Sequence, residues 1–174
     1  MPSSTPIRVA QVVGLTTAAF FAGQSAATTY ILCPSIMEAP APLLAKQWRS
    51  AWTKGRAIGP PLVVGLTATF GFLAFHEYSI ITPYSSCVPF GLLAGAAALM
   101  ISIVPFTVLV IGPTNRALAR KAEEADTLAS LMDVVMEKES NTHWLVDRWA
   151  TLNLVRAGIL GLSAVLAAWG VVGY

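Results

Sequence analysis

Four long apolar segments place the strongest constraint on what this chain can fold into. They cover residues 7–32, 58–75, 88–111 and 154–173. A helix needs about 20 residues to cross the roughly 30 Å hydrocarbon core of a bilayer, and each segment is about that long. The segments therefore predict an all-α fold, a four-helix transmembrane bundle in which residues 1–174 form a single domain.

The composition agrees with a bilayer as the surroundings of this chain. Hydrophobic residues make up 55% of it and charged residues only 11%, against roughly 25% charged residues in soluble domains. The net charge of +2 is small and dispersed, so no nucleic-acid partner is expected. Within the first segment, Arg8 precedes an apolar run that ends in small residues, as in a signal peptide. We expect it to be retained as a span.

Prolines mark two of the apolar segments. The second begins with Gly59-Pro60-Pro61, and a helix tolerates proline in its first turn, where the N–H has no partner to lose. We therefore expect a helix to begin there. Pro105 lies inside the third segment, where it removes a backbone hydrogen bond and predicts a kink.

The positions of the lysines and arginines predict the orientation, because cytoplasmic loops are enriched in both. They concentrate in the two large connections and in the start of the fourth segment: Lys46, Arg49, Lys54, Arg56, Arg116, Arg120, Lys121, Lys138, Arg148 and Arg156. The opposite side carries only Arg8. Both large loops are therefore expected in the cytoplasm, and both termini on the other side of the membrane.

The second large loop is expected to be helical. Apolar residues recur in it at helical spacing, which predicts an additional cytoplasmic amphipathic helix lying on the membrane or on the bundle: Leu118, Ala125, Leu128, Met132 and Val135. Residues 139–141 form a candidate N-cap for a further helix, about 30 residues long, that runs without a break into the fourth segment.

Polar side chains gather near the cytoplasmic edge of the last two spans. Asn153 and Arg156 are three residues apart and share a helix face with Trp149, and Asn115 ends the third span. Arg156 could simply reach up to the headgroups, and the asparagines could simply join the two helices by a hydrogen bond. The alternative is a site, because polar groups at this depth usually face the bundle interior or a polar cavity.

Aromatic residues lie on the same side: Tyr30, Trp48, Trp52, Trp144 and Trp149. They fit an interfacial aromatic belt or a flat wall for an aromatic ligand. His143 is a candidate base near a helix N-terminus, and Asp147, four residues on, could orient it or act as the base itself. On an unbroken helix, however, this pair points away from the face of Trp149.

Two stretches together resemble the anthrone oxygenase family of four-span membrane proteins: VPFTVLVIGPTNRAL and DRWATLNLVRAGI. The residues that carry the resemblance are Pro105, Thr107, Pro113, Thr114, Asn115, Leu118, Trp149, Asn153 and Arg156. The stretch LLAKQWRSAWTKG is also similar, although Trp52 stands where the family commonly has another aromatic residue such as tyrosine.

The resemblance implies an oxygenase of polyketide pathways that converts an anthrone to an anthraquinone with molecular oxygen. The protein would reside in the endoplasmic reticulum or another endomembrane. An anthrone anion is electron-rich enough to react with oxygen directly, so no cofactor is predicted. The expected catalytic residues are Asn115, Asn153, Arg156, His143 and Asp147, and the expected substrate-binding residues are Tyr30, Trp48, Trp149 and Thr107.

Three alternatives stay open at this point. One is a metal- or haem-dependent membrane oxidoreductase, although the only two histidines, His76 and His143, are expected on opposite sides of the membrane. The others are a non-enzymatic scaffold and a small transporter, for which the sequence offers no repeat and no ionisable group near the bilayer midplane. The oligomeric state is open, with a homo-oligomer among the options.

Overall fold

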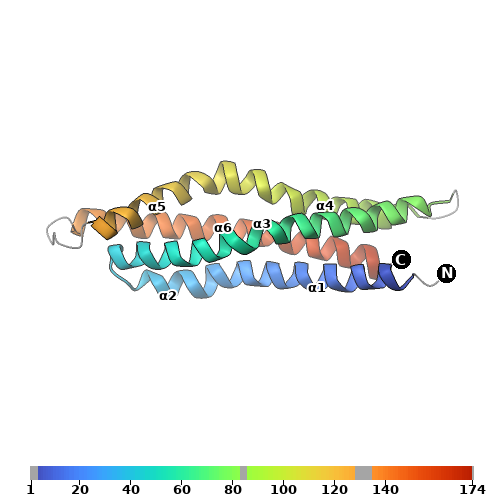
Figure 1. Ribbon diagram of the computed structural model, residues 1–174, viewed down its shortest axis with the longest axis horizontal. Helices are drawn as coiled ribbons and strands as arrows, with labels where there is room; N and C mark the ends of the chain where they lie inside the picture. Colours follow the sequence, from blue (N-terminus) through green and yellow to red (C-terminus); the bar gives the residue numbers. More distant parts are fainter. Residues whose placement is uncertain (1–3, 83–85, 128–134, 174) are drawn as a thin grey trace. The chain divides into compact units, whose positions relative to one another are not determined.

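A computed structural model describes residues 4–82, 86–127 and 135–173, and these residues are almost entirely helical (Figure 1). The elements are α1 (Thr5–Ala27), the π-helix η1 (Thr28–Leu32), α2 (Cys33–Met37), α3 (Ala41–Ser79), α4 (Val88–Pro105), the π-helix η2 (Phe106–Ile111), α5 (Gly112–Thr127) and α6 (Val135–Val172). No strand occurs within the described ranges, so the all-α prediction is confirmed.

Consecutive elements join into four helical stretches that are long and apolar enough to cross a membrane: Thr5–Met37, Ala41–Ser79, Val88–Asp126 and Asn141–Val172. Each contains one of the apolar segments expected from the sequence, except that the last helix ends one residue earlier, at Val172. The longest of them have 39 residues, or about 58 Å at 1.5 Å per residue, so they exceed a roughly 30 Å hydrocarbon core.

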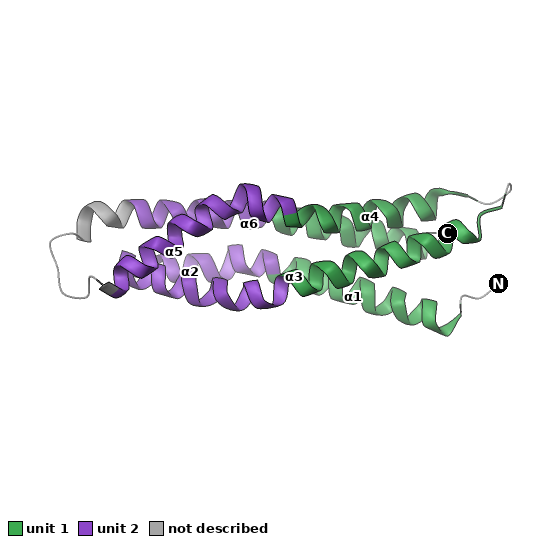
Figure 2. Cartoon of the chain, turned by 45° about the horizontal axis from the view of Figure 1, so that its top comes forward, with its two compact units in different colours: residues 1–24, 60–104, 156–174 green, residues 25–59, 105–155 purple. Residues whose placement is uncertain are grey.

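The chain divides into two compact units, coloured green and purple in Figure 2. Unit 1 comprises residues 1–24, 60–104 and 156–174, and unit 2 comprises residues 25–59 and 105–155. Along the chain, the divisions fall at Pro60 and Pro105 in the second and third helical stretches.

Unit 1 has an apolar core built from all four helical stretches. Its largest fully buried side chains are Phe70, Leu73, Leu93, Met100 and Leu160. Small residues allow its helices to approach closely. A Cβ added at Gly14 of α1 would lie only 2.9 Å from Thr69 Cγ2 of α3.

Hydroxyl groups within unit 1 bond to nearby backbone carbonyls. The Thr67 hydroxyl donates to the Val63 carbonyl at 2.7 Å, and the buried Ser163 hydroxyl donates to the Ala96 carbonyl of α4 at 2.8 Å. Backbone and side-chain polar groups must find such partners wherever lipid replaces water. Large apolar side chains remain exposed on the unit, among them Phe20, Phe75 and Val165, and a lipid-facing surface requires such side chains.

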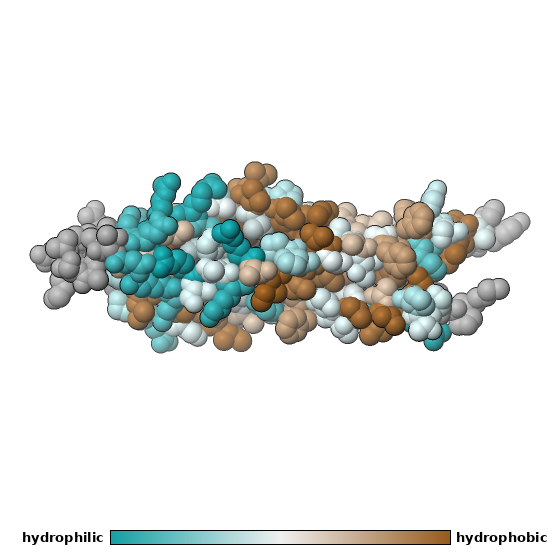
Figure 3. Space-filling model, viewed as in Figure 1, coloured by the Kyte–Doolittle hydropathy of each residue, from teal (hydrophilic) through white to brown (hydrophobic). Residues whose placement is uncertain are grey.

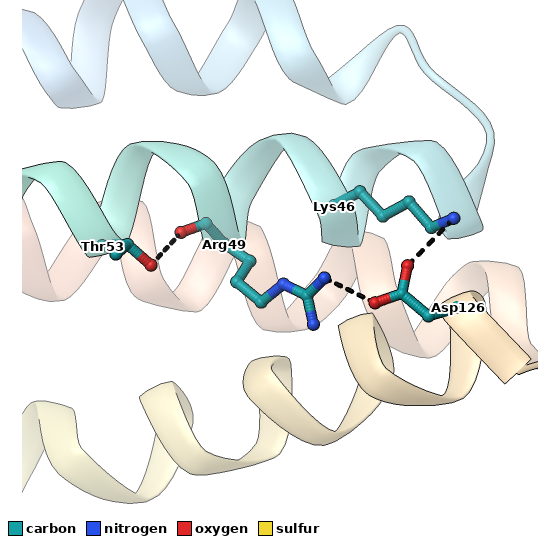
Figure 4. Close-up of polar contacts among 4 residues, drawn as sticks. All are labelled: Lys46, Arg49, Thr53 and Asp126. Atoms are coloured by element: carbon teal, nitrogen blue, oxygen red, sulfur yellow. Dashed lines mark hydrogen bonds and ion pairs between the residues drawn. The ribbon is translucent and has the colours of Figure 1, made fainter.

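Unit 2 is more polar on its surface. Figure 3 shows hydrophilic residues gathered over α5, whereas much of the surface over α4 in unit 1 is apolar. Asp126 at the end of α5 pairs with Lys46 at 3.1 Å and with Arg49 at 2.5 Å, both on α3 (Figure 4). These ion pairs join the C-terminal end of α5 to the first turns of α3.

Two short π-helices interrupt the regular helices. In η1, the Cys33 N–H donates to the Thr28 carbonyl five residues earlier. The η2 π-helix begins directly after Pro105, which lacks the N–H that a regular α-helix would use. Local π adjustments are one way in which a span accommodates proline. The helix type therefore changes at Pro105, while the kink predicted there stays a prediction.

Two expectations about helix ends are wrong, and the additional amphipathic helix is not shown. Pro60 and Pro61 lie inside the 39-residue α3 and not in its first turn. Residues 139–141 lie within α6 and do not cap it. The separate amphipathic helix is not found, because residues 118–127 continue the third helical stretch as α5, and the rest of the expected segment, residues 128–134, lies outside the described residues. The common reason is that hydropathy detects the apolar part of a helix, whereas these helices continue into segments in which polar and apolar residues mix.

Candidate functional site

Three tryptophans of unit 2 form one aromatic cluster. Trp48 and Trp52 are four residues apart on α3 and therefore on one helix face, and their rings stack at 5.4 Å between centroids with 13° between planes. Trp149 of α6 meets Trp48 edge-on, with centroids 5.8 Å apart and an interplanar angle of 86°. Both geometries are ones that aromatic pairs prefer.

The cluster lies inside the apolar core of unit 2. Trp48 is fully buried and Trp149 is 6% exposed. The buried side chains packed with them come from α2, α3, η2, α5 and α6: Cys33, Ile36, Leu44, Ile111, Leu118, Leu145, Val146 and Ala150. Trp52 is half-buried, and the Arg56 guanidinium lies 5.2 Å from its ring centroid, which makes a cation–π contact at the outer end of the stack.

Two asparagines hold Trp149 in place. The Trp149 Nε1–H donates to Asn115 Oδ1 of α5 at 2.9 Å. Asn153 lies one turn further along α6, and its Nδ2 donates to the Trp149 backbone carbonyl at 2.8 Å. The first bond joins α5 to α6, as an interhelical hydrogen bond does in membrane bundles.

Two polar atoms of this cluster are buried and have no hydrogen-bond partner within the described part of the chain. One is the Trp48 Nε1–H, a donor, and the other is the Asn153 Oδ1, an acceptor. Buried polar groups in native proteins are overwhelmingly paired, so each such exception needs an explanation.

The unbroken α6 separates the candidate base pair from this cluster. His143 is half-buried and Asp147 is exposed, while Trp149 and Asn153 are buried. His143 lies six residues before Trp149, and at 100° per residue this places the two side chains about 120° apart around the helix. The structure therefore brings together Trp48, Trp149, Asn115 and Asn153, but not His143 and Asp147 with them.

The remaining predicted site residues lie elsewhere. Tyr30 on η1 is 66% exposed and is not part of the cluster. Thr107 is half-buried on η2, and its carbonyl oxygen lies 3.5 Å from the position that a Cβ would take at Gly112. Arg156 is half-buried and is the first residue of the α6 portion that belongs to unit 1.

Trp52 was expected only as one member of the aromatic group on this side of the membrane, and Thr29 was not predicted at all. Trp52 completes the stack, and its four-residue spacing from Trp48 was a signal for a shared face. The Thr29 hydroxyl of η1 donates to the Ala150 carbonyl at 3.1 Å, beside Trp149 on α6. No sequence pattern indicated this contact, because the two residues are 121 positions apart.

Trp144 fits the interfacial interpretation of the tryptophans instead. It is 55% exposed and contacts the Arg148 guanidinium, with 5.4 Å between its ring centroid and Cζ. Across the described residues, His, Cys, Asp and Glu side chains form no group of three that could hold a metal ion.

Comparisons with known proteins agree on one family. The family model described as anthrone oxygenase matches residues 48–166. An anthrone oxygenase of Claviceps purpurea is 28% identical over 92% of this chain and 87% of its own length. The anthrone oxygenase encC of Aspergillus fumigatus is 28% identical over 90% of this chain and 92% of its own length. A noranthrone monooxygenase of Aspergillus flavus is 27% identical over 94% of this chain and 73% of its own length. No solved structure matches the chain.

Proposed function

We propose that this chain, which belongs to the anthrone oxygenase family and is an oxygenase, oxidises an anthrone to an anthraquinone in a polyketide pathway. The observation that carries the proposal is the family match over residues 48–166, which includes Trp48, Asn115, Trp149 and Asn153 of the buried cluster. The name of the Aspergillus flavus relative indicates a closely related substrate class, a noranthrone.

The overall reaction inserts one atom of molecular oxygen and reduces the other to water. A base first removes a proton from the acidic CH₂ between the two aromatic rings. The resulting anion gives its electrons to oxygen and a carbon–oxygen bond forms at that carbon. The removed proton then returns to the outer oxygen, which gives a hydroperoxide. Loss of water, which takes the second hydrogen of the former CH₂ and the outer peroxide oxygen, leaves the new quinone carbonyl.

A flat polycycle needs an aromatic surface, and the tryptophan cluster supplies one. In this proposal the rings of Trp48 and Trp149 contact the substrate, with Thr107 as a further substrate-binding residue. Tyr30 contributes from its exposed position on η1. Stacking between aromatic rings adds about 0.5–1.5 kcal/mol to the burial of their area.

Positive charge and N–H donors would stabilise the anion. Arg156 supplies a permanent charge and follows Asn153 by three positions on α6. Asn115 uses its Oδ1 for Trp149, which leaves its Nδ2 as the donor for a developing oxyanion. Such donors are effective because they are held in place and shielded from water. Asn153 is the third of the proposed anion-stabilising residues.

His143 or Asp147 would act as the base. His143 is the half-buried member of the pair and Asp147 the exposed one, so water competes least at His143. Both lie away from the Trp149 face of α6, and proton transfer would therefore run through an intervening water or a reorientation of the side chain. With His143 as the base, His143→Gln lowers kcat strongly, whereas Asp147→Asn has a smaller effect.

The proposed surroundings are those of a membrane enzyme. The substrate enters the site from the bilayer of the endoplasmic reticulum or another endomembrane, and both large loops face the cytoplasm. Molecular oxygen is the co-substrate and no cofactor is proposed. An absorption spectrum and metal analysis of the purified protein test that last point directly, because a haem or a stoichiometric metal would contradict it.

Oxygen uptake by the detergent-purified protein tests the function. Emodin anthrone is the probe, and its spontaneous oxidation is subtracted. We expect uptake well above this blank, one quinone formed per oxygen consumed, and loss of activity in Arg156→Ala. Uptake equal to the blank with several anthrones, from protein shown to be folded, would contradict the proposal.

A further inference from the structure

The buried donor and acceptor of the tryptophan cluster both belong to residues that contact Trp149. Trp48 packs its ring edge-on against Trp149, and Asn153 bonds to the Trp149 carbonyl. Trp48 and Asn153 are both fully buried, yet Trp48 Nε1 and Asn153 Oδ1 have no partner among the described residues. A buried polar group without a partner is destabilising, so a molecule that satisfies both atoms would be bound favourably.

The chemical identity of these two atoms follows from their neighbours. A tryptophan Nε1 can only donate. Asn153 must point its NH₂ group at the Trp149 backbone carbonyl, because a carbonyl oxygen can only accept, and its Oδ1 is therefore the free acceptor. By the same reasoning Asn115 directs its Oδ1 at Trp149 Nε1, so its acceptor is already occupied.

We propose that Trp48 Nε1–H and Asn153 Oδ1 together bind one hydroxyl group on the aromatic rings of the substrate. A phenolic hydroxyl both accepts and donates a hydrogen bond, which matches one free donor and one free acceptor. This inference rests on the proposed function and deepens it, because it makes Trp48 and Asn153 determinants of substrate choice. Trp48 then donates a hydrogen bond to the substrate in addition to contacting its rings.

The position of that hydroxyl on the substrate can also be inferred. Hydroxyls beside the anthrone carbonyl already donate to it within the molecule. A hydroxyl remote from the carbonyl has no such internal partner, and it gains most from a buried donor and acceptor. Trp48 and Asn153 are closed to solvent in the structure, so binding requires this cluster to open, and the half-buried Trp52 and Asn115 are its more accessible members.

Two anthrones that differ by a single ring hydroxyl test the inference. Emodin anthrone carries a hydroxyl remote from the carbonyl, and chrysophanol anthrone lacks it. The measured quantity is the ratio of kcat/KM for the two substrates, from which the fraction of folded protein cancels. The variants of the full chain are Trp48→Phe and Asn153→Leu, and the control is Trp52→Phe, which also replaces an indole of the same stack by a phenyl ring.

We expect the unaltered protein to prefer emodin anthrone by about three- to tenfold, the range of a net hydrogen bond to a neutral group. The ratio should fall towards one in Trp48→Phe and Asn153→Leu, but not in Trp52→Phe. The double variant should show no further fall, because both side chains act on the same hydroxyl. No preference in the unaltered protein, or an unchanged ratio in Trp48→Phe, would overturn the inference and leave the proposed function standing.

Binding of the two corresponding anthraquinones, followed by quenching of tryptophan fluorescence, gives the same comparison without turnover. Selective binding that Trp48→Phe or Asn153→Leu abolishes would support the hydroxyl site even if the protein oxidised neither anthrone. In that case the proposed function, and not the hydroxyl site, would be wrong. Equal binding of both anthraquinones by the unaltered protein would count against the site.

Discussion

Asn115 determines how the indole of Trp149 is placed, because its Oδ1 accepts the hydrogen bond from Trp149 Nε1 at 2.9 Å. We expect Asn115→Leu to lower the free energy of unfolding by about 1–3 kcal/mol, since it leaves a nearly buried N–H without its acceptor. Thermal unfolding in detergent, followed by near-ultraviolet circular dichroism, measures the change.

A second variant separates the hydrogen bond from the loss of packing at Asn115. In a Trp149→Phe background the indole N–H is absent, so Asn115→Leu should then have a smaller effect than in the unaltered chain. The difference between the two effects is the coupling energy of the pair. Equal losses in the two backgrounds would show that Asn115 acts through packing alone.

The sequence predicted which residues around Trp149 are neighbours, but not the contacts between their individual atoms. Trp149, Asn153 and Asn115 were recognised as neighbours at the edge of two spans, because helical spacing and depth along a span can be read directly from residue numbers. The roles of the individual atoms could not be read in this way. Which nitrogen donates to which oxygen depends on side-chain rotamers, as does the burial of Trp48 against Trp149. The exposure of Tyr30 depends on the rotation of the π-helical η1.

At the scale of elements, α4 and α6 of unit 1 approach closely at Gly170. A Cβ at this position would lie 3.2 Å from Leu92 Cβ and 3.2 Å from Leu93 Cγ. Gly170→Val should therefore lower the free energy of unfolding by about 1–3 kcal/mol through overpacking. Chemical unfolding in mixed detergent measures the effect.

Gly158 on the same helix is the matched control. A Cβ there meets nothing within 4 Å. The same substitution, Gly158→Val, should be close to neutral, because the added Cβ meets open space and valine has at least the helix propensity of glycine. Equal destabilisation by both substitutions would mean that glycine is needed for backbone flexibility and not for helix contact.

The ion pairs between α3 and α5 should contribute in a salt-dependent way. Asp126 accepts from both Lys46 and Arg49, and all three side chains are partly exposed. We expect Asp126→Asn to lower the melting temperature at low ionic strength and to have little effect in concentrated salt, where exposed charges are screened. Glu124→Gln is the control, since its pairing with Lys121 stays within α5. An Asp126→Asn effect that is the same at both salt concentrations would contradict this view.

The helices α3 and α5 also show what hydropathy alone does not predict. Apolar length identified all four long helices, because the bilayer selects for it. The prolines Pro60 and Pro61 were misplaced, because α3 continues on their N-terminal side for 19 residues (41–59) in which polar and apolar residues mix. In the same way, α5 extends the third stretch into a charged segment, GPTNRALARKAEEADT. Helix ends in these regions depend on tertiary contacts such as those of Asp126.

At the scale of the whole molecule, the distribution of lysine and arginine predicts that both large loops face the cytoplasm. Chemical labelling of Cys87 tests this orientation directly. It is exposed and free in the short connection between α3 and α4, which by this orientation lies on the side opposite the cytoplasm. The other cysteine, Cys33, is buried and free, and Cys33→Ser removes any background labelling.

In sealed microsomes that expose their cytoplasmic face, a membrane-impermeant maleimide should label Cys87 only after detergent is added. In a Cys87→Ser, Cys33→Ser background, Arg120→Cys places a thiol at an exposed position of α5, in the second large loop, and it should be labelled without detergent. Four crossings put these two positions on opposite sides whichever way the chain is inserted, so labelling of both under the same condition would contradict the four-span fold. The reversed pattern would keep the fold and invert the orientation, and the cytoplasmic side would then carry Cys87.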